Sequence, residues 1–169
     1  MSYVKIATMP ELPTSDSYLS HRRNHSRTPA TKAIASQSWL IANLPGMSDG
    51  DRKCLNDCKI ETTQQLLTRT HTAEKQQELA TQLKMHPQYL KKWIALANLS
   101  RIPTVGCEHC GVLLHAGIIS PDHLARTPLP RLHQQIVKLH VAQLRNKDQC
   151  PSLSDVRGWQ HQARQLQPF

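Results

Sequence analysis

The spacing of hydrophobic residues changes near residue 38 of the 169-residue chain. Residues 1–38 show neither a helical nor a strand period. From residue 39 onward, hydrophobic side chains recur every three or four positions, which places them on one face of a helix. The spacing is clearest at 72–85, 89–99, 129–144 and 153–166, and no segment shows a strand pattern. The pattern therefore predicts an all-α domain at 39–169, preceded by an extended basic N-terminal arm at 1–38.

The helical region contains one pattern of hydrophobic residues twice. When residues 44–70 are aligned with residues 102–128, an offset of 58, hydrophobic and proline positions coincide. The matched pairs are Leu44 with Ile102, Pro45 with Pro103, Leu55 with Leu113, Ile60 with Ile118 and Leu66 with Leu124. Two tandem repeats are predicted, at about 40–98 and about 99–167. Neither is long enough to bury a sound core alone, so we expect them to pack as one compact domain.

Helix starts and core anchors recur at equivalent places in the two repeats. Thr62 and Ser120 precede the second helix of each repeat, and Ser152 precedes the last helix. Hydroxyl groups at such positions accept a hydrogen bond from an N–H group of the first turn. Trp93 and Trp159 each lie on the hydrophobic face of the last helix of their repeat. We therefore predict that both tryptophans are buried core residues rather than ligand platforms.

Each repeat begins with a segment that resembles the helix-hairpin-helix element: LPGMSDGDRKCL (44–55) and IPTVGCEHCGVLL (102–114). In that element two glycines form a tight turn ahead of a helix, whose first N–H groups can bind a DNA phosphate. Each segment here keeps one glycine of the pair. In the first segment Gly46 occupies the first glycine position and Ser48 replaces the second glycine. In the second segment Thr104 replaces the first glycine and Gly106 occupies the second position. The repeats are therefore identified as helix-hairpin-helix-like units with incomplete turns.

Carboxylates near both turns count against duplex DNA as the ligand. Asp49 and Asp51 follow the first turn and Glu108 follows the second, where each would repel a phosphate. The basic charge and the hairpin segments nevertheless keep nucleic-acid binding open as the alternative function. The residues that would act in it are Lys91, Lys92, Arg101 and Gly106.

Residues 39–166 resemble a helix-hairpin-helix-related family of unknown function that is widespread in cyanobacteria. The resemblance rests on the segments VGCEHCGVLLHAGI (105–118), HPQYLKKWIALANLSRIP (86–103) and CPSLSDVRGW (150–159). It implies a tandem helical fold and no particular activity. It also implies a cyanobacterial setting, in which a basic non-catalytic protein can serve acidic antenna complexes.

The charge balance favours an acidic partner. The formal net charge is +9, and residues 1–36 hold five Lys and Arg against two acidic residues, with almost nothing to bury. We expect such a segment to be disordered alone and to gain order on a partner. Arginine forms bidentate contacts with carboxylates and tyrosine is enriched at interfaces. The predicted partner-binding residues are therefore Tyr18, Arg22, Arg23 and Arg27.

The sequence predicts a non-catalytic protein. It contains no Ser/His/Asp set, paired carboxylates or Gly-rich phosphate loop, so we expect no enzymatic activity, no small-molecule substrate and no cofactor. No hydrophobic run approaches the ~20 residues that cross a bilayer, and the N-terminus lacks the pattern of a signal peptide. We expect a cytoplasmic protein, with the cytoplasmic face of a photosynthetic membrane as one option. The leading hypothesis is a linker or assembly factor that docks by its arm and helical domain onto a large acidic protein assembly, such as the phycobilisome.

The five cysteines, Cys54, Cys58, Cys107, Cys110 and Cys150, are an odd number, which argues against a disulfide framework in the cytosol. Cys54 and Cys58 align with small apolar positions of the second repeat, so we expect them to be buried. Cys107 begins a predicted helix, whose dipole would lower its pKa. Cys107, Cys110 and Cys150 are the candidates for a zinc site. Structural thiols are the preferred interpretation, ahead of a metal site and of thiol exchange.

Overall fold

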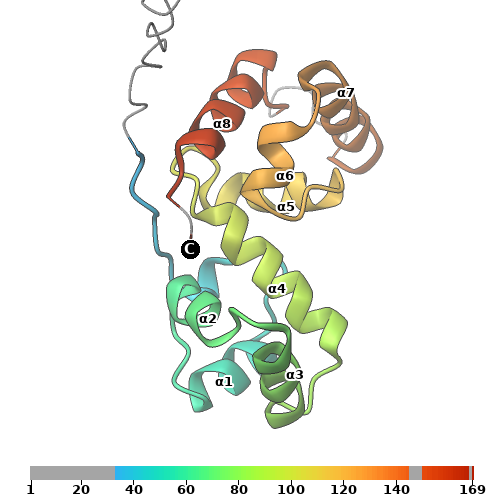
Figure 1. The fold of residues 1–169 in the computed structure, drawn as a ribbon. Coiled ribbons are helices and arrows are strands. Elements are labelled where there is room, and N and C mark those ends of the chain that lie inside the picture. Colours follow the sequence, from blue (N-terminus) through green and yellow to red (C-terminus); the bar gives the residue numbers. More distant parts are fainter. Residues whose placement is uncertain (1–32, 145–149, 168) are drawn as a thin grey trace, which may run out of the picture. The chain divides into compact units, whose positions relative to one another are not determined.

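The computed structural model describes residues 33–144, 150–167 and 169. This part of the chain is helical, and its extended segments form only two isolated bridges, Ile34 with Leu166 and Leu40 with Thr62. Figure 1 shows the α-helices, which are α1 (Asp49–Asp57), α2 (Thr63–Arg69), α3 (Ala73–Gln82), α4 (Pro87–Ser100), α5 (Gly106–His115), α6 (Pro121–Arg126), α7 (Leu129–Leu139) and α8 (Leu153–Gln165). The all-α prediction is confirmed.

The order of helices repeats, with α1–α4 followed by α5–α8. The second helices start 58 residues apart, at residues 63 and 121, which is the offset of the hydrophobic pattern. The fourth helices start at residues 87 and 153, so the offset has grown to 66 there. The added length lies between α7 and α8, where a π-helical segment (His140–Leu144) continues α7. The predicted helix at 129–144 is therefore α-helical only to Leu139.

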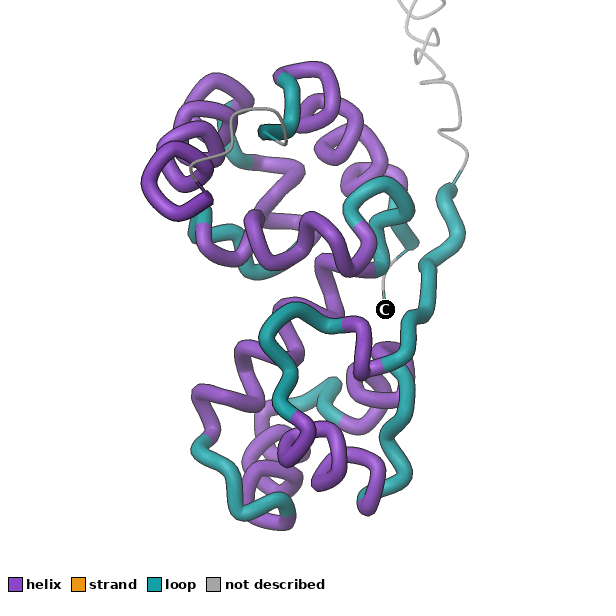
Figure 2. Tube along the Cα trace, turned by 180° about the vertical axis from the view of Figure 1, so that it is seen from behind, coloured by secondary structure: helices purple, strands orange, loops and turns teal. Residues whose placement is uncertain are grey.

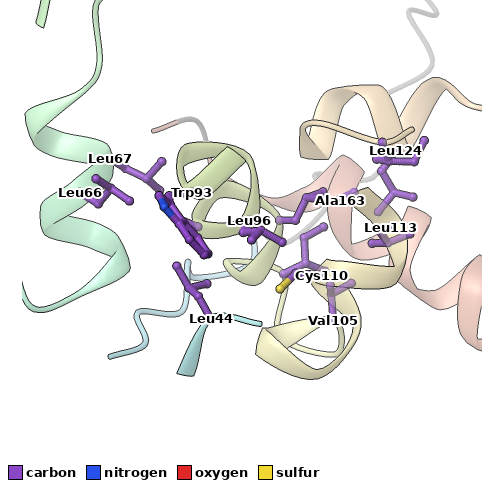
Figure 3. Packing of buried hydrophobic residues seen from close by; sticks show 14 of the residues in the cluster. Leu44, Leu66, Leu67, Trp93, Leu96, Val105, Cys110, Leu113, Leu124 and Ala163 are labelled. Carbon is purple, nitrogen blue, oxygen red and sulfur yellow. The ribbon is translucent and has the colours of Figure 1, made fainter. Parts of the chain in front are cut away.

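Apart from Pro45 and Pro103, which are half-buried, the residues that the alignment pairs are buried in both repeats, as are the two tryptophans. Each of these buried residues exposes at most 3% of its surface, and the pairs are Leu44 with Ile102, Leu55 with Leu113, Ile60 with Ile118, Leu66 with Leu124 and Trp93 with Trp159. Figure 3 shows Trp93 extending from α4 toward Leu44 and Leu67, while Cys110 of α5 lies near Leu96. The prediction that both tryptophans are core residues is confirmed.

Side-chain caps begin the helices where the sequence predicted them. The hydroxyl groups of Thr62, Ser120 and Ser152 each accept a hydrogen bond of 3.2 Å from the backbone N–H three residues later. Gln65 and Asp155 complete capping boxes by accepting from the backbone N–H groups of Thr62 and Ser152. A cap of this kind contributes about 1 kcal/mol, so these residues fix the helix starts locally.

Helix α4 packs against α2 and α3 of the first repeat and against α5 of the second. An extended segment, residues 33–40, runs beside the helices (Figures 1 and 2). We call it the strap. The backbone N–H of Ile34 donates to Gln165 at the end of α8 (2.9 Å), and the N–H of Thr63 in α2 donates to Trp39 (2.8 Å). The strap therefore joins the last helix to the first repeat, although most of it falls within the predicted arm.

Candidate functional site

The first hairpin turn places carboxylates at the start of α1. Gly46 takes a positive φ of 74°, which glycine adopts without strain. Ser48 caps α1 by accepting from the N–H of Asp51 (3.1 Å), and its hydroxyl donates to the Asp51 carboxylate (2.8 Å). Asp49 lies in the same first turn. The positive end of this helix is thus already complemented by two acids, which would repel a phosphate.

The second hairpin turn is covered by the strap. Gly106 also has a positive φ, 50°, and is buried. A Cβ atom there would lie 3.3 Å from Cζ2 of Trp39, so the indole ring rests on the glycine. The same ring donates its N–H to the carbonyl of Ser100 (2.9 Å). A cleft of about 530 Å³ remains beside Trp39, with Glu108 in its lining. Gly106, a residue of the nucleic-acid alternative, is therefore packed against protein and not open to a phosphate.

Arg101, another residue predicted to act if the protein binds nucleic acid, is also buried. It is only 5% exposed, and burial lowers the pKa of its guanidinium. Its guanidinium donates to Ser36 Oγ (2.7 Å), Asn98 Oδ1 (2.9 Å) and the carbonyl of Gln167 (2.6 Å). It thereby ties the strap and the segment after α8 to the end of α4. Arg101 thus lies buried among protein acceptors, with its guanidinium directed to them rather than to the surface.

The two lysines of the same alternative remain exposed on α4. The Lys92 ammonium lies 4.8 Å from the centroid of the Trp93 ring, and a Cβ atom at Gly46 would be 3.6 Å from it. Lys92 therefore lies over Gly46 in the first hairpin turn. Of the four predicted nucleic-acid residues, the structure leaves Lys91 and Lys92 accessible and buries the other two.

The cysteine predictions are partly overturned. Cys54 is exposed and Cys58 half-buried, because Leu55 is the residue of α1 that takes the buried position. Burial, and then the nearby Cys107, raise the pKa of Cys110 to about 12. Burial also raises the pKa of Cys107, which contradicts the expected lowering by the helix dipole. Thiolates are therefore disfavoured at this pair near neutral pH.

The three candidate zinc ligands, Cys107, Cys110 and Cys150, are not part of a metal-binding cluster among the described residues. In the described part of the chain, no group of three or more His, Cys, Asp or Glu residues is placed to hold a metal ion. All five thiols are free, and Cys110 Sγ contacts the carbonyl of Cys107 at 3.5 Å instead. Cys150 is half-buried and directs its thiol to the carbonyl of Pro151 (3.8 Å).

A groove that the sequence reasoning missed lies at the turn after α5 and along α6 and α7. Its volume is about 390 Å³, and its lining includes His123, Arg126, Arg131 and Gln135. One sequence signal marks it, since no Asp or Glu occurs between Asp122 and Asp148. The predicted arm anchors Tyr18, Arg22, Arg23 and Arg27 lie outside the described residues.

The described residues thus define an all-α protein of two successive four-helix units. The chain belongs to the family of domains of unknown function DUF4332, whose model matches residues 45–166. A search of characterised proteins and a search of solved structures each found no match. The family match covers both repeats and begins after the strap.

Proposed function

We propose that this chain is a non-catalytic interaction protein, a linker or assembly factor that docks onto a large acidic protein assembly. The observation that carries the proposal is how few charges of the described residues are paired with one another. In the part of the chain that the structure describes, a single ion pair is present, between Arg52 and Asp49 (2.9 Å), and both of its side chains are largely exposed. A pair of this kind contributes little to stability. Apart from Arg52 and the buried Arg101, the Lys and Arg side chains of the described residues are exposed and in no ion pair, so they remain available to an external anionic partner.

The geometry of the hairpin turns favours a protein partner over nucleic acid. A phosphate would have to approach Asp49 and Asp51 at the first turn, or displace the ring of Trp39 at the second. Nucleic-acid binding would then depend on Lys91, Lys92 and other surface cations rather than on the turns. Nucleic-acid binding remains the competing proposal, because phosphate contacts of surface cations need no particular turn.

The arm extends the same charge pattern. Its cations can raise the association rate with an acidic surface over a distance of about one Debye length, ~8–10 Å at physiological salt. Arg22, Arg23 and Arg27 then contact carboxylates, and Tyr18 occupies a shallow pocket of the partner. Each exposed ion pair contributes at most about 1 kcal/mol, so affinity is spread over many contacts.

The cellular setting is proposed from the resemblance to cyanobacterial helix-hairpin-helix-related proteins. In that setting the acidic assembly is the phycobilisome or another photosynthetic complex, and the protein acts in the cytoplasm or at the cytoplasmic face of the photosynthetic membrane. Within the described part of the chain, every helix falls short of the length and hydrophobicity that a bilayer span requires. The proposal includes no catalytic step and no cofactor.

Co-sedimentation with isolated phycobilisomes tests this function. The full-length chain should sediment with the particles at physiological salt and be released as salt is raised, because the contacts are between charges. Albumin, an acidic protein without a role in assembly, serves as the control for unspecific charge attraction. Equal retention on albumin and on the phycobilisome, or no retention on the phycobilisome, would contradict the proposal.

A further inference from the structure

The groove near α6 and α7 is formed by three segments. Ala116, Gly117 and Ile118 form the turn after α5, His123 and Arg126 come from α6, and Arg131 and Gln135 come from α7; Thr127 and Pro128 connect the two helices. We call this set the cationic groove. It includes neither hairpin turn, and neither Lys91 nor Lys92 lines it.

The cations of the groove are accessible and have no carboxylate partner in the described part of the chain. Arg126 and Arg131 are both exposed, and neither takes part in an ion pair there. No Asp or Glu is among the described lining residues. The sequence from 123 to 147 contains no Asp or Glu at all. Asp122, one turn before Arg126 on α6, is the nearest acidic residue along the chain, and it forms no ion pair with Arg126.

The backbone that carries these cations is held firmly. Gln160 of α8 is buried and its side-chain amide donates to the carbonyls of Leu124 (3.0 Å) and Thr127 (2.6 Å). The Thr127 hydroxyl donates to the carbonyl of His123 (2.7 Å). The end of α6 is thus fixed against α8 before any ligand arrives, which lowers the ordering cost of binding.

Helix α7 extends the charged surface beyond the groove. Leu132 and Ile136 are fully buried and anchor one face of α7 in the core. Arg131 and Lys138, two turns apart, are both exposed, and a spacing of seven residues places them on the same side of the helix. A ligand that leaves the groove along α7 therefore meets a further cation.

We propose that the cationic groove is the docking site on the helical region for an acidic segment of the partner protein. This inference rests on the proposed function and names the surface of the helical region that contacts the partner. The arginine side chains match carboxylates in charge and in bidentate geometry. Ala116, Ile118 and Pro128 add apolar lining that suits the aliphatic parts of a peptide. No aromatic side chain is among the described residues that line the groove apart from the His123 imidazole, so it offers no extended platform on which successive nucleic-acid bases could stack.

The test compares two variants of the full chain with the wild type. Arg126→Gln/Arg131→Gln removes two groove cations that support no ion pair among the described residues. The matched control is Arg157→Gln in combination with Lys53→Gln, which removes the same charge from exposed positions of α8 and α1 outside the groove. Binding of a fluorescent oligo-glutamate peptide is followed by anisotropy, and thermal unfolding checks that each variant is folded.

We expect the groove variant to bind the peptide roughly five- to twentyfold more weakly, from two exposed ion pairs that each contribute up to about fivefold. The control should lose less than about twofold, because charges outside the groove act only through the screened long-range field. Amide NMR shifts in the wild type should cluster at Gly117, Thr127 and Gln135 when the peptide is added.

Other outcomes show whether the proposed groove, the proposed function or both are wrong. Equal losses in the groove variant and the control would show that net charge alone acts, and would overturn the groove. The groove is likewise overturned as a peptide site if its variant loses affinity for a DNA oligonucleotide but not for the peptide, since it then serves nucleic acid. If wild type and groove variant both sediment equally with phycobilisomes, the groove is wrong and the proposed function stands. If the wild type binds neither acidic peptide nor phycobilisome, both fail.

Discussion

Replacing Trp39 is expected to loosen the junction between the two repeats. Trp39 lies on the strap, and its ring contacts Gly106 at the start of α5. Its indole N–H donates to the carbonyl of Ser100 at the end of α4 (2.9 Å). Its backbone carbonyl accepts from the N–H of Thr63 in α2 (2.8 Å). One residue thus connects the strap to both repeats, and Trp39→Ala removes both side-chain contacts while the backbone bonds to Thr63 remain.

The expected loss follows from these contacts. Truncating a fully buried tryptophan to alanine costs about 3–5 kcal/mol, and Trp39 is half-buried, so the lower part of that range or less applies. The freed carbonyl belongs to Ser100, which is fully buried, and an unsatisfied buried acceptor costs about 1–3 kcal/mol. Water can reach this carbonyl once the ring is removed, so the lower part of the second range applies, and we expect the free energy of unfolding to fall by about 2–4 kcal/mol in total. In a domain of this size that lowers the Tm by roughly 6–15 °C.

Thermal unfolding followed by circular dichroism measures this effect. Trp39→Phe is the matched control, since it keeps a ring over Gly106 and loses the N–H donor. Its expected loss is about 1–2 kcal/mol, clearly smaller than that of alanine. If Trp39→Ala unfolds within about one degree of the wild type, the strap does not stabilise the junction between the repeats.

Three further outcomes are expected. Deleting residues 1–32, which leaves the strap whole, should change the Tm by less than about 2 °C and weaken binding to the acidic partner severely; a large drop in Tm would show that the arm belongs to the core. In a timed iodoacetamide reaction at neutral pH read by mass spectrometry, exposed Cys54 should react first and Cys110, with its pKa raised to about 12, last; the reverse order would contradict the burial. Hydrogen bonds from Ser152 lower the pKa of Asp155, so its contribution is present above the unfolded pKa of about 4 and lost as pH falls through the folded value. The Tm of the wild type should therefore exceed that of Asp155→Asn at near-neutral pH, and the gap should close in acid; a gap independent of pH would rule out the capping role.

Local signals predicted the helices well because they act within a few residues. The hydroxyl of Thr62 caps α2 and that of Ser152 caps α8, and each bond is closed inside one helical turn. Burial of Leu55 with Leu113 follows from the repeated hydrophobic spacing. These determinants need no knowledge of distant parts of the chain.

The strap and the buried arginine could not be predicted in this way. The strap has no hydrophobic period, and its hydrogen bonds join residues far apart, such as Ile34 with Gln165. Arg101 resembles any other basic residue in the sequence, and its burial depends on acceptors from Ser36 and Gln167. The alignment of Cys54 with an apolar position likewise failed, because neighbouring helix positions are about 100° apart and Leu55 faces the core instead.

The cationic groove could be found only from the three-dimensional structure, because its lining residues come from a turn and two helices. The acid-free run at 123–147 was visible in the sequence, but a run of cations is by itself no more than a solvated surface. Only the structure shows that Arg126 and Arg131 line one groove and that no described carboxylate lines it with them.

Competition at physiological salt distinguishes an acidic protein partner from nucleic acid. The full-length chain is bound to isolated phycobilisomes, and duplex DNA of random sequence is added in increasing amounts while the retained protein is measured. We expect most of the protein to stay on the phycobilisome when DNA phosphate and particle carboxylate are present in comparable amounts. Release at low DNA concentration, together with a steep log–log dependence of the DNA affinity on salt, would show instead that nucleic acid is the preferred partner.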